Sequence, residues 1–267
     1  MVEKPKSGQI TGRHIRDAGR DPQKSGNLTA MLRFPLLRRQ QVWFPTLWGW
    51  CALLVVVVAA CVIAGRYIHM FLAQNDPVPQ ARILVVEGWL TGAELDQAVA
   101  AFRMGGYARV ITTGGPTESW LNFNGNSNYA DWAASYLKTH GLADADVTPV
   151  PAPASAQERT FLSAVKVRDW AVTQRLALNA FNVFSAGTHA RRSRILYRMA
   201  FGPNVDVGIL SAQPQEYDEH AWWRTSAGAK SVITETISLL WTICFFYPAP
   251  PHSEEEMWGE QRHAVRQ

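Results

Sequence analysis

Cysteine is scarce in this sequence, and its scarcity excludes one class of protein. The 267 residues include three cysteines, at positions 51, 61 and 244. Small secreted scaffolds held together by disulfides need many more, at close spacing. The sequence also contains neither a Cys-x-x-Cys pair nor a Cys/His set with the spacing of a structural zinc site. We therefore expect no disulfide framework, and we assign no residue to a metal ion.

Charged residues are also few, and they are unevenly distributed. They make up 18% of the chain, against 47% hydrophobic residues, and the net charge is +4. Residues 1–46 contain nine basic and three acidic residues, a net charge of +6, so the remaining 221 residues carry −2. The basic excess thus belongs to a polar tail, residues 1–45, that we predict to be largely disordered. Attraction to anionic lipid explains this tail more simply than DNA does, so we expect no nucleic-acid partner.

One long stretch has no charge at all. Between Arg39 and Arg66 lie 26 uncharged, mostly apolar residues, and about 20 such residues span the roughly 30 Å hydrocarbon core of a bilayer. A signal peptide would lie nearer the N-terminus and end in a small-residue cleavage site. A buried core helix of this length would rarely lack a polar face. We therefore predict a single retained transmembrane helix over residues 46–72.

The basic residues around this helix predict its orientation. Nine Lys and Arg residues precede it, and only Arg66 and Arg82 follow shortly after. Because segments rich in Lys and Arg stay on the cytoplasmic side, the N-terminus is predicted to be cytoplasmic. The rest of the chain would then lie outside the plasma (inner) membrane, with the lipid bilayer as its first partner.

Beyond a linker at residues 73–80, short apolar segments alternate with helical ones. Strands are expected at 83–86, 109–112, 147–150, 181–184 and 205–210, and helices at 91–105, 128–140, 156–176, 189–201 and 231–246. This alternation predicts one α/β domain, residues 81–250, with a Rossmann-like, doubly wound, mostly parallel five-stranded sheet. The last helix either covers the core or docks on the membrane surface. The polar tail, residues 251–267, is expected to be loose.

Ligands of open parallel sheets bind beyond the carboxyl ends of the strands, and three predicted strand ends carry suitable groups. After the first strand, Glu87 and Gly88 offer a carboxylate and a turn, although Glu87 could also cap a helix or pair with an arginine. After the second strand come Thr113, Gly114 and Gly115. Adjacent glycines let backbone amides approach an anion, but a tight turn needs them equally. No G-x-G-x-x-G or Walker pattern occurs, so nucleotide binding does not follow.

The third strand end runs from Ser185 to Arg192. His189 and Arg192 fall at the start of a helix, where free amides and the helix dipole attract anions. Arg192 shares its helical face with apolar residues and is expected to point inward, either as an anion clamp or as half of a buried ion pair with Glu87. The other arginines of this helix are expected to be solvated: Arg191, Arg194 and Arg198.

Two further residues, Arg159 and Thr160, add hydrogen-bond donors in the first turn of the 156–176 helix, although a surface helix start would look the same. No G-x-S-x-G motif is present, so Ser185 is a poor hydrolase nucleophile. We therefore name Glu87 and His189 as candidate catalytic residues and leave the cofactor unassigned. The expected ligand-binding residues are Gly88, Thr113, Gly114, Gly115, Arg159, Thr160, Ser185 and Arg192.

Taken in order over residues 83–241, these motifs resemble the SanA/ElyC/YdcF family, a group of Rossmann-like domains of unknown function. The matching segments are Val86–Trp89, Thr113–Gly115, Arg159–Thr160 with Ser163–Ala164, and His189-x-x-Arg192. A membrane-anchored subgroup has a closing segment similar to Tyr217, Trp222–Trp223 and Glu235. The resemblance implies a role in envelope integrity and in peptidoglycan or lipid-carrier metabolism. Glu87-Gly88-Trp89 departs from the Gly-rich turn of many members, which speaks against a nucleotide or S-adenosylmethionine ligand.

Two functions remain open. The first is an envelope enzyme or ligand-binding protein whose phosphate-bearing ligand, for example a lipid-linked sugar, lies between Gly114–Gly115 and Arg192. His189 would then act as acid or base, and Glu87 would orient or activate. The second is a non-catalytic envelope factor that recruits protein partners through the surface near Trp120, Trp222 and Trp223. Glu87, His189 and Arg192 lining one cleft would favour the first function, and sealing them in the interior would favour the second.

Overall fold

The computed structural model describes residues 43–117, 127–155 and 158–251, together with Ser253 and Glu256. Contacts divide the chain into two units, residues 1–48 and 49–267, and the second holds the α/β domain and all of helix α1 (Leu47–Leu72) but its first two residues. Residues 1–42 of the tail that we predict to be disordered, and most of the tail 251–267, lie outside the described residues.

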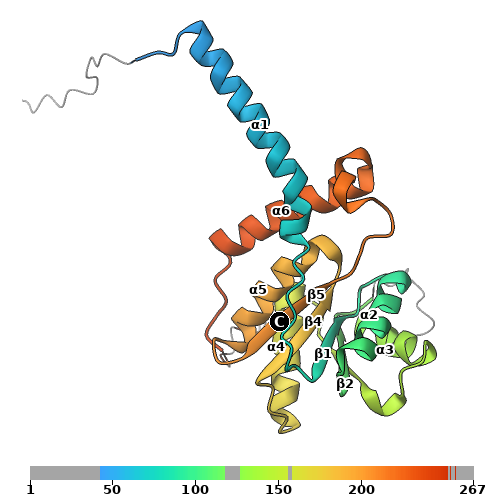
Figure 1. Cartoon of the computed structure of the whole chain (residues 1–267). Coiled ribbons are helices and arrows are strands. Elements are labelled where there is room, and N and C mark those ends of the chain that lie inside the picture. The colour runs from blue at the N-terminus through green and yellow to red at the C-terminus, as the bar shows by residue number, and fades with distance from the viewer. Residues whose placement is uncertain (1–42, 118–126, 156–157, 252, 254–255, 257–267) are drawn as a thin grey trace, which may run out of the picture. The chain divides into compact units, whose positions relative to one another are not determined.

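The domain is built on a five-stranded sheet, as predicted (Figure 1). Its strands are β1 (Ile83–Glu87), β2 (Arg109–Gly114), β3 (Val147–Pro151), β4 (Ala180–Ser185) and β5 (Asp206–Ser211). All neighbouring strands pair in parallel, in the order β3-β2-β1-β4-β5. The chain therefore winds outward from β1 to β3, then crosses to β4 and winds the other way. The switch lies between β1 and β4, and parallel sheets bind ligands at the carboxyl ends of such a pair.

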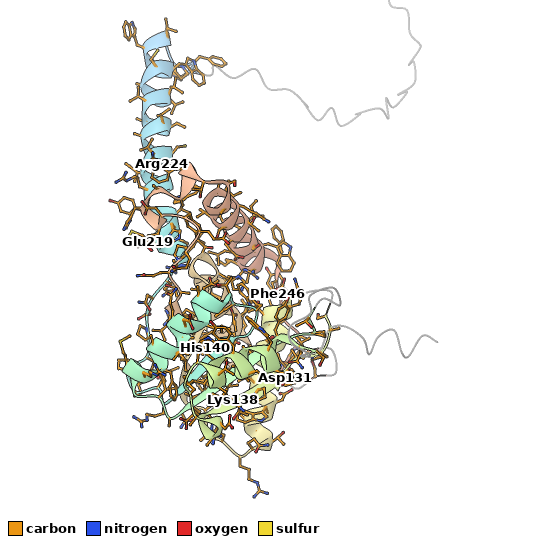
Figure 2. All side chains as sticks on the ribbon, turned by 90° about the vertical axis from the view of Figure 1, so that its right-hand side faces the viewer. Asp131, Lys138, His140, Glu219, Arg224 and Phe246 are labelled. Carbon is orange, nitrogen blue, oxygen red and sulfur yellow. The ribbon has the colours of Figure 1, made fainter. Side chains whose placement is uncertain are left out.

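Helices cover both faces of the sheet because the strand residues alternate between two cores. Leu84 and Val86 of β1 pack with α2 (Gly92–Gly105) and α3 (Tyr129–Thr139). Ile83 and Val85 pack on the opposite face with α4 (Arg159–Thr173) and α5 (Ala190–Phe201). Figure 2 looks at the α2/α3 layer, with Lys138 marking α3. The Rossmann-like α/β prediction is thus confirmed.

Capping residues set the helix starts. Thr91 and Glu94 form the capping box that opens α2. The last helix, α6 (Ser226–Phe245), begins five residues before its expected start because Thr225 caps it, its Oγ1 accepting from the Gly228 amide at 3.1 Å. The residues after this cap are small and polar, so they carry no hydrophobic periodicity that would reveal a helix.

Helix α1 is the one helix among the described residues that is long and apolar enough to cross a membrane. It has 26 residues and a mean hydropathy of 2.6 in its most apolar part, where none of its residues is buried. Only His69 and Leu72, near its C-terminal end, are buried. Leu72 packs against Val232 and Leu239 of α6. The C-terminal end of α1 is therefore part of the domain's packing.

Two arginines predicted to be solvated are instead engaged with α1 and the linker. Arg191 donates from Nε to the Phe71 carbonyl, and its guanidinium lies 3.9 Å from the centre of the Phe71 ring. Arg194 pairs with Asp76 at 2.7 Å. The prediction failed because helical spacing does not reveal that α1 and the linker cover this side of α5. Arg198 is exposed, as expected.

The C-terminal tail is not loose throughout. Glu256 is only 3% exposed, and both of its carboxylate oxygens accept from Arg168, at 2.6 and 2.7 Å. Arg168 also donates to the Ala200 carbonyl at 2.9 Å. Burial of two charges in a matched pair fixes this part of the tail against α4, a contact that the polar composition of the segment does not reveal.

Candidate functional site

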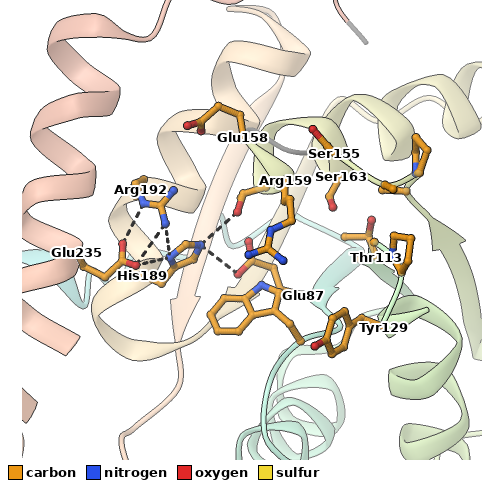
Figure 3. Close-up of a pocket in the computed structure, with 18 of the residues that line it drawn as sticks. Glu87, Thr113, Tyr129, Ser155, Glu158, Arg159, Ser163, His189, Arg192 and Glu235 are labelled. Carbon is orange, nitrogen blue, oxygen red and sulfur yellow. Dashed lines mark hydrogen bonds and ion pairs between the residues drawn. The ribbon is translucent and has the colours of Figure 1, made fainter. Parts of the chain in front are cut away.

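A cavity of about 930 Å³ opens at the carboxyl ends of the strands, where the sheet order reverses (Figure 3). Eight of the ten predicted site residues line it: Glu87, Thr113, Gly114, Gly115, Arg159, Thr160, His189 and Arg192. Lining residues that sequence reasoning did not place in the site include Trp89, Tyr129, Glu158, Ser163, Glu235 and Trp241. Gly88 and Ser185 do not line the cavity.

Glu87 is held rigidly at the end of β1. The residue is 2% exposed, and its carboxylate accepts hydrogen bonds from Ser185 Oγ at 2.5 Å and Ser193 Oγ at 2.8 Å. Because β1 and β4 are neighbours, Glu87 and Ser185 end side by side. Ser185, which does not itself line the cavity, thus holds the carboxylate that faces it. Ser193, in the first turn of α5, holds the same carboxylate, and it was not identified from the sequence.

His189 lies between two carboxylates from opposite sides of the site (Figure 3). Its Nδ1 is 3.0 Å from Glu235 of α6, and its Nε2 is 3.9 Å from Glu87 and 3.4 Å from Thr160 Oγ1. The edge-on ring of Trp89 packs against it, with ring centres 5.0 Å apart. The imidazole is therefore fixed in orientation, with Nε2 among groups that line the cavity.

Arg192 does point inward, but its partner is not Glu87. Its Nε donates to Glu235 Oε2 at 2.9 Å and its Nη2 to Oε1 at 3.3 Å, a bidentate pair that leaves both side chains 16% exposed. Nη2 also lies 3.0 Å from His189 Nδ1. Spacing along α5 shows which way Arg192 points, but only the packing of α6 shows what it meets.

The neutral His189 ring can carry its proton on Nδ1 or on Nε2, and the surrounding groups suit both tautomers. An arginine only donates, so Nδ1 accepts from Arg192 in one tautomer and donates to Glu235 in the other. In the first tautomer Nε2 carries the proton toward Thr160 and Glu87; in the second it keeps a lone pair there. Such an imidazole can give or take a proton at Nε2 without losing its support.

Glu235 is ionised across the physiological range. Burial raises its pKa, but the hydrogen bonds and positive charges of His189 and Arg192 outweigh burial and lower the pKa to about 2. The sequence carries one sign of its importance: Glu235 is the only Asp, Glu, Lys or Arg between residues 231 and 253. A lone carboxylate on an apolar helix needs a buried partner.

Arg159 differs from Arg192 in having no counter-charge. It is exposed and lines the cavity at the start of α4, and its guanidinium forms no hydrogen bond or ion pair with any described residue. Glu158, which precedes it, has a positive φ of 45° and a buried Oε2 without a partner among the described residues. Burial raises the pKa of Glu158, and the charges of Arg192 and His189 oppose that rise.

Thr113 contributes a buried hydroxyl to the cavity wall. The residue is 1% exposed, and its Oγ1 has no hydrogen-bond partner among the described residues. Buried hydroxyls are normally paired, and an unpaired one costs about 1–3 kcal/mol. An oxygen-rich ligand in the cavity would relieve that cost.

Two of the three predicted glycines are required by packing. A Cβ on Gly88 would lie 2.3 Å from the Tyr129 carbonyl oxygen, and one on Gly114 would lie 2.7 Å from Tyr129 Cβ. Both glycines let the start of α3 approach the strand ends closely. Gly115 has room for a side chain, its nearest neighbour being the Pro153 carbonyl oxygen at 3.7 Å.

Within the described parts of the chain, no group of three or more His, Cys, Asp or Glu side chains is placed to hold a metal ion. Trp120 falls outside those residues, Trp222 donates its indole N–H to the Gly65 carbonyl of α1 at 2.8 Å, and Trp223 is 45% exposed.

Comparisons of the chain with family models, with curated proteins and with solved structures gave no match.

Proposed function

We propose that this chain is a single-pass, membrane-anchored protein of the SanA/ElyC/YdcF type that binds an anionic, phosphate-bearing ligand in the cavity at the strand ends. One observation carries the proposal: the cavity combines an imidazole braced by Glu235 with Arg159, a cation that no described residue neutralises. A lipid-linked sugar phosphate of the cell envelope is the ligand class that the resemblance implies.

Arg159 takes the role of the anion-binding cation. The charge of Arg192 is already matched by Glu235, so Arg192 positions the imidazole instead. The first-turn amides of α4 have no acceptor within their own helix, and a phosphate oxygen is a good one. The Thr113 hydroxyl supplies a further donor on the cavity wall.

His189 is the group that could move a proton in this site. Its Nε2 lies 3.4 Å from the Thr160 hydroxyl and 3.9 Å from the Glu87 carboxylate. The site thus supports acid or base assistance to a leaving or attacking oxygen of the ligand.

The anchor and its orientation rest on two observations. Helix α1 presents apolar side chains that are not buried, and nine basic residues precede it in the sequence. We infer an N-terminus in the cytoplasm and a domain on the outer side of the plasma membrane.

A matched pair of variants tests the ligand proposal. We expect the full chain in detergent to bind inorganic pyrophosphate, measured by isothermal titration calorimetry, and Arg159→Ala to weaken that binding at least tenfold, because it removes a charge-assisted bond of about 1.5–3 kcal/mol. The control is Arg198→Ala, which removes an exposed arginine of α5 outside this cavity. Equal affinity in both variants, or no binding by the wild type, would contradict the proposal.

The exposed Trp223 supports the alternative, a non-catalytic factor that recruits protein partners. Under that alternative we expect Trp223→Ala to abolish the function of the protein in cells and His189→Ala to retain it. The reverse pattern excludes the alternative.

A further inference from the structure

Helix α6 is apolar on its outward face as well as on the face that packs against the rest of the domain. Ile233, Ile237 and Leu240 lie one to two helical turns apart and are 53–63% exposed. The inward face carries Glu235, which lines the cavity, and the buried Val232, Leu239 and Thr242. The outward surface continues over the exposed residues Trp241, Ile243, Cys244, Phe245 and Tyr247. A helix whose outward face meets water normally has polar residues on that face.

The charges around this face resemble those of a helix lying in a membrane interface. After Glu235, which points inward, α6 contains no Asp, Glu, Lys or Arg. Exposed basic residues stand at the other end, Arg224 just before the helix and Lys230 in its second turn, with the exposed Trp223 beside them. Arg224 and Phe246 bracket α6 in Figure 2. Basic residues and tryptophan at one end with an apolar face beyond suit the boundary between head groups and acyl chains.

The packing of α6 against α1 identifies what covers this face. About 20 residues of α1 suffice to cross the roughly 30 Å hydrocarbon core, so the last turns of its 26 residues reach the head groups. Those turns contain Ile68 and Leu72, which pack with Val232 and Leu239 of α6. The apolar face of α6 therefore starts at the depth where α1 leaves the bilayer.

The sheet edge that bears the cavity lies at the same level. Ser211, the last residue of β5, donates to the Ala73 carbonyl directly after α1 at 3.3 Å. Trp241 of α6 lines the cavity while being 42% exposed. Helix α6 thus has the cavity on one side and its bare apolar face on the other.

We propose that α6 lies in the surface of the bilayer that α1 crosses, with the face of Ile233, Ile237, Leu240 and Cys244 among the acyl chains. This proposal rests on the anchor role of α1 proposed above. It places the mouth of the cavity at the lipid surface, so that a ligand can enter from the membrane.

The native cysteines allow a direct test in the full chain, because Cys244 lies on the proposed face and Cys61 lies in α1. One variant keeps only Cys244 and another keeps only Cys61, the remaining cysteines being changed to serine. The control combines loss of all three with Met104→Cys, a position on α2 that is 82% exposed. Each is labelled with an environment-sensitive fluorophore and reconstituted into phosphatidylcholine vesicles containing one quarter phosphatidylglycerol.

Quenching by nitroxide lipids and by iodide, present on both sides of the membrane, separates the outcomes. We expect the label at Cys244 to be quenched by nitroxide lipid and at least fivefold less by iodide than the label at Met104→Cys. Iodide quenching of Cys244 equal to that control overturns the proposal, as does protection from both quenchers, which would indicate a protein partner. In either case lipid quenching at Cys61 leaves the anchor intact, whereas its absence overturns the anchor as well.

Discussion

At the scale of single residues, the site depends on side chains that brace other side chains. Glu235 holds His189 and Arg192, while two serine hydroxyls hold Glu87. The sequence predicts which residues end the strands, because apolar runs stop at them. It does not predict their partners, because Glu235 lies on another helix, 43 residues after Arg192 in the chain. Pairings of that kind are set by tertiary packing.

The lowered pKa of Glu235 makes a pH prediction. A carboxylate whose pKa falls from 4.5 to about 2 on folding stabilises the folded state above pH 4.5, by about 3 kcal/mol, and loses that contribution as the pH falls toward 2. We expect Glu235→Gln to be less stable than the wild type at pH 7 and the difference to shrink between pH 4.5 and 2. Urea unfolding in detergent across this range measures it. A difference independent of pH would show that Glu235 is not ionised in the folded protein.

At the scale of elements, the strands are predicted well, and the largest error is the start of α6. Apolar runs such as Ile83–Val86 are read directly because buried parallel strands need apolar side chains on both faces. The early start of α6 was missed because its cap, Thr225, precedes small residues. The close contact between α3 and the strand ends was not predicted either, because a glycine in a turn and a glycine in a close contact look alike in sequence.

That contact predicts a contrast between neighbouring glycines. Gly88→Ala would place a methyl group 2.3 Å from the Tyr129 carbonyl oxygen, so α3 must shift, and we expect a loss of about 1–3 kcal/mol in unfolding free energy. Gly115→Ala is the matched control: its Cβ would lie 3.7 Å from the nearest atom, the Pro153 carbonyl oxygen. We expect it to cost well under 1 kcal/mol. Chemical denaturation of the two variants decides. Equal losses would mean that α3 is not seated closely on β1.

At the scale of the whole molecule, segments outside the predicted domain are part of its structure. The predicted boundaries at residues 81 and 250 follow the alternation of strands and helices, and the sheet confirms that core. They leave out Asp76, which pairs with Arg194, and Glu256, which pairs with Arg168. Polar segments give no periodic signal, so ion pairs that attach them to the domain escape sequence analysis.

The pair between Arg168 and Glu256 yields a prediction at this scale. Glu256→Ala leaves the 7% exposed Arg168 without its main counter-charge, and we expect a loss of about 3–5 kcal/mol in unfolding free energy. Asp144→Ala, which breaks the exposed pair with Lys138, is the control and should cost under 1 kcal/mol. Thermal unfolding monitored by circular dichroism compares them. A Glu256 variant as stable as the control would show that the pair with Arg168 does not hold the tail against the domain.

The linker after α1 has a consequence for how β5 meets the solvent. Asp76 and Ile209 exchange two backbone hydrogen bonds, at 2.8 and 3.1 Å, so the linker shields part of the outer margin of the sheet. Without it, β5 would be an open edge strand with free amide and carbonyl groups, a template on which a second chain can add. A chain shortened to begin after residue 80 would therefore tend to self-associate through β5, and one that retains residues 73–80 would keep this edge capped.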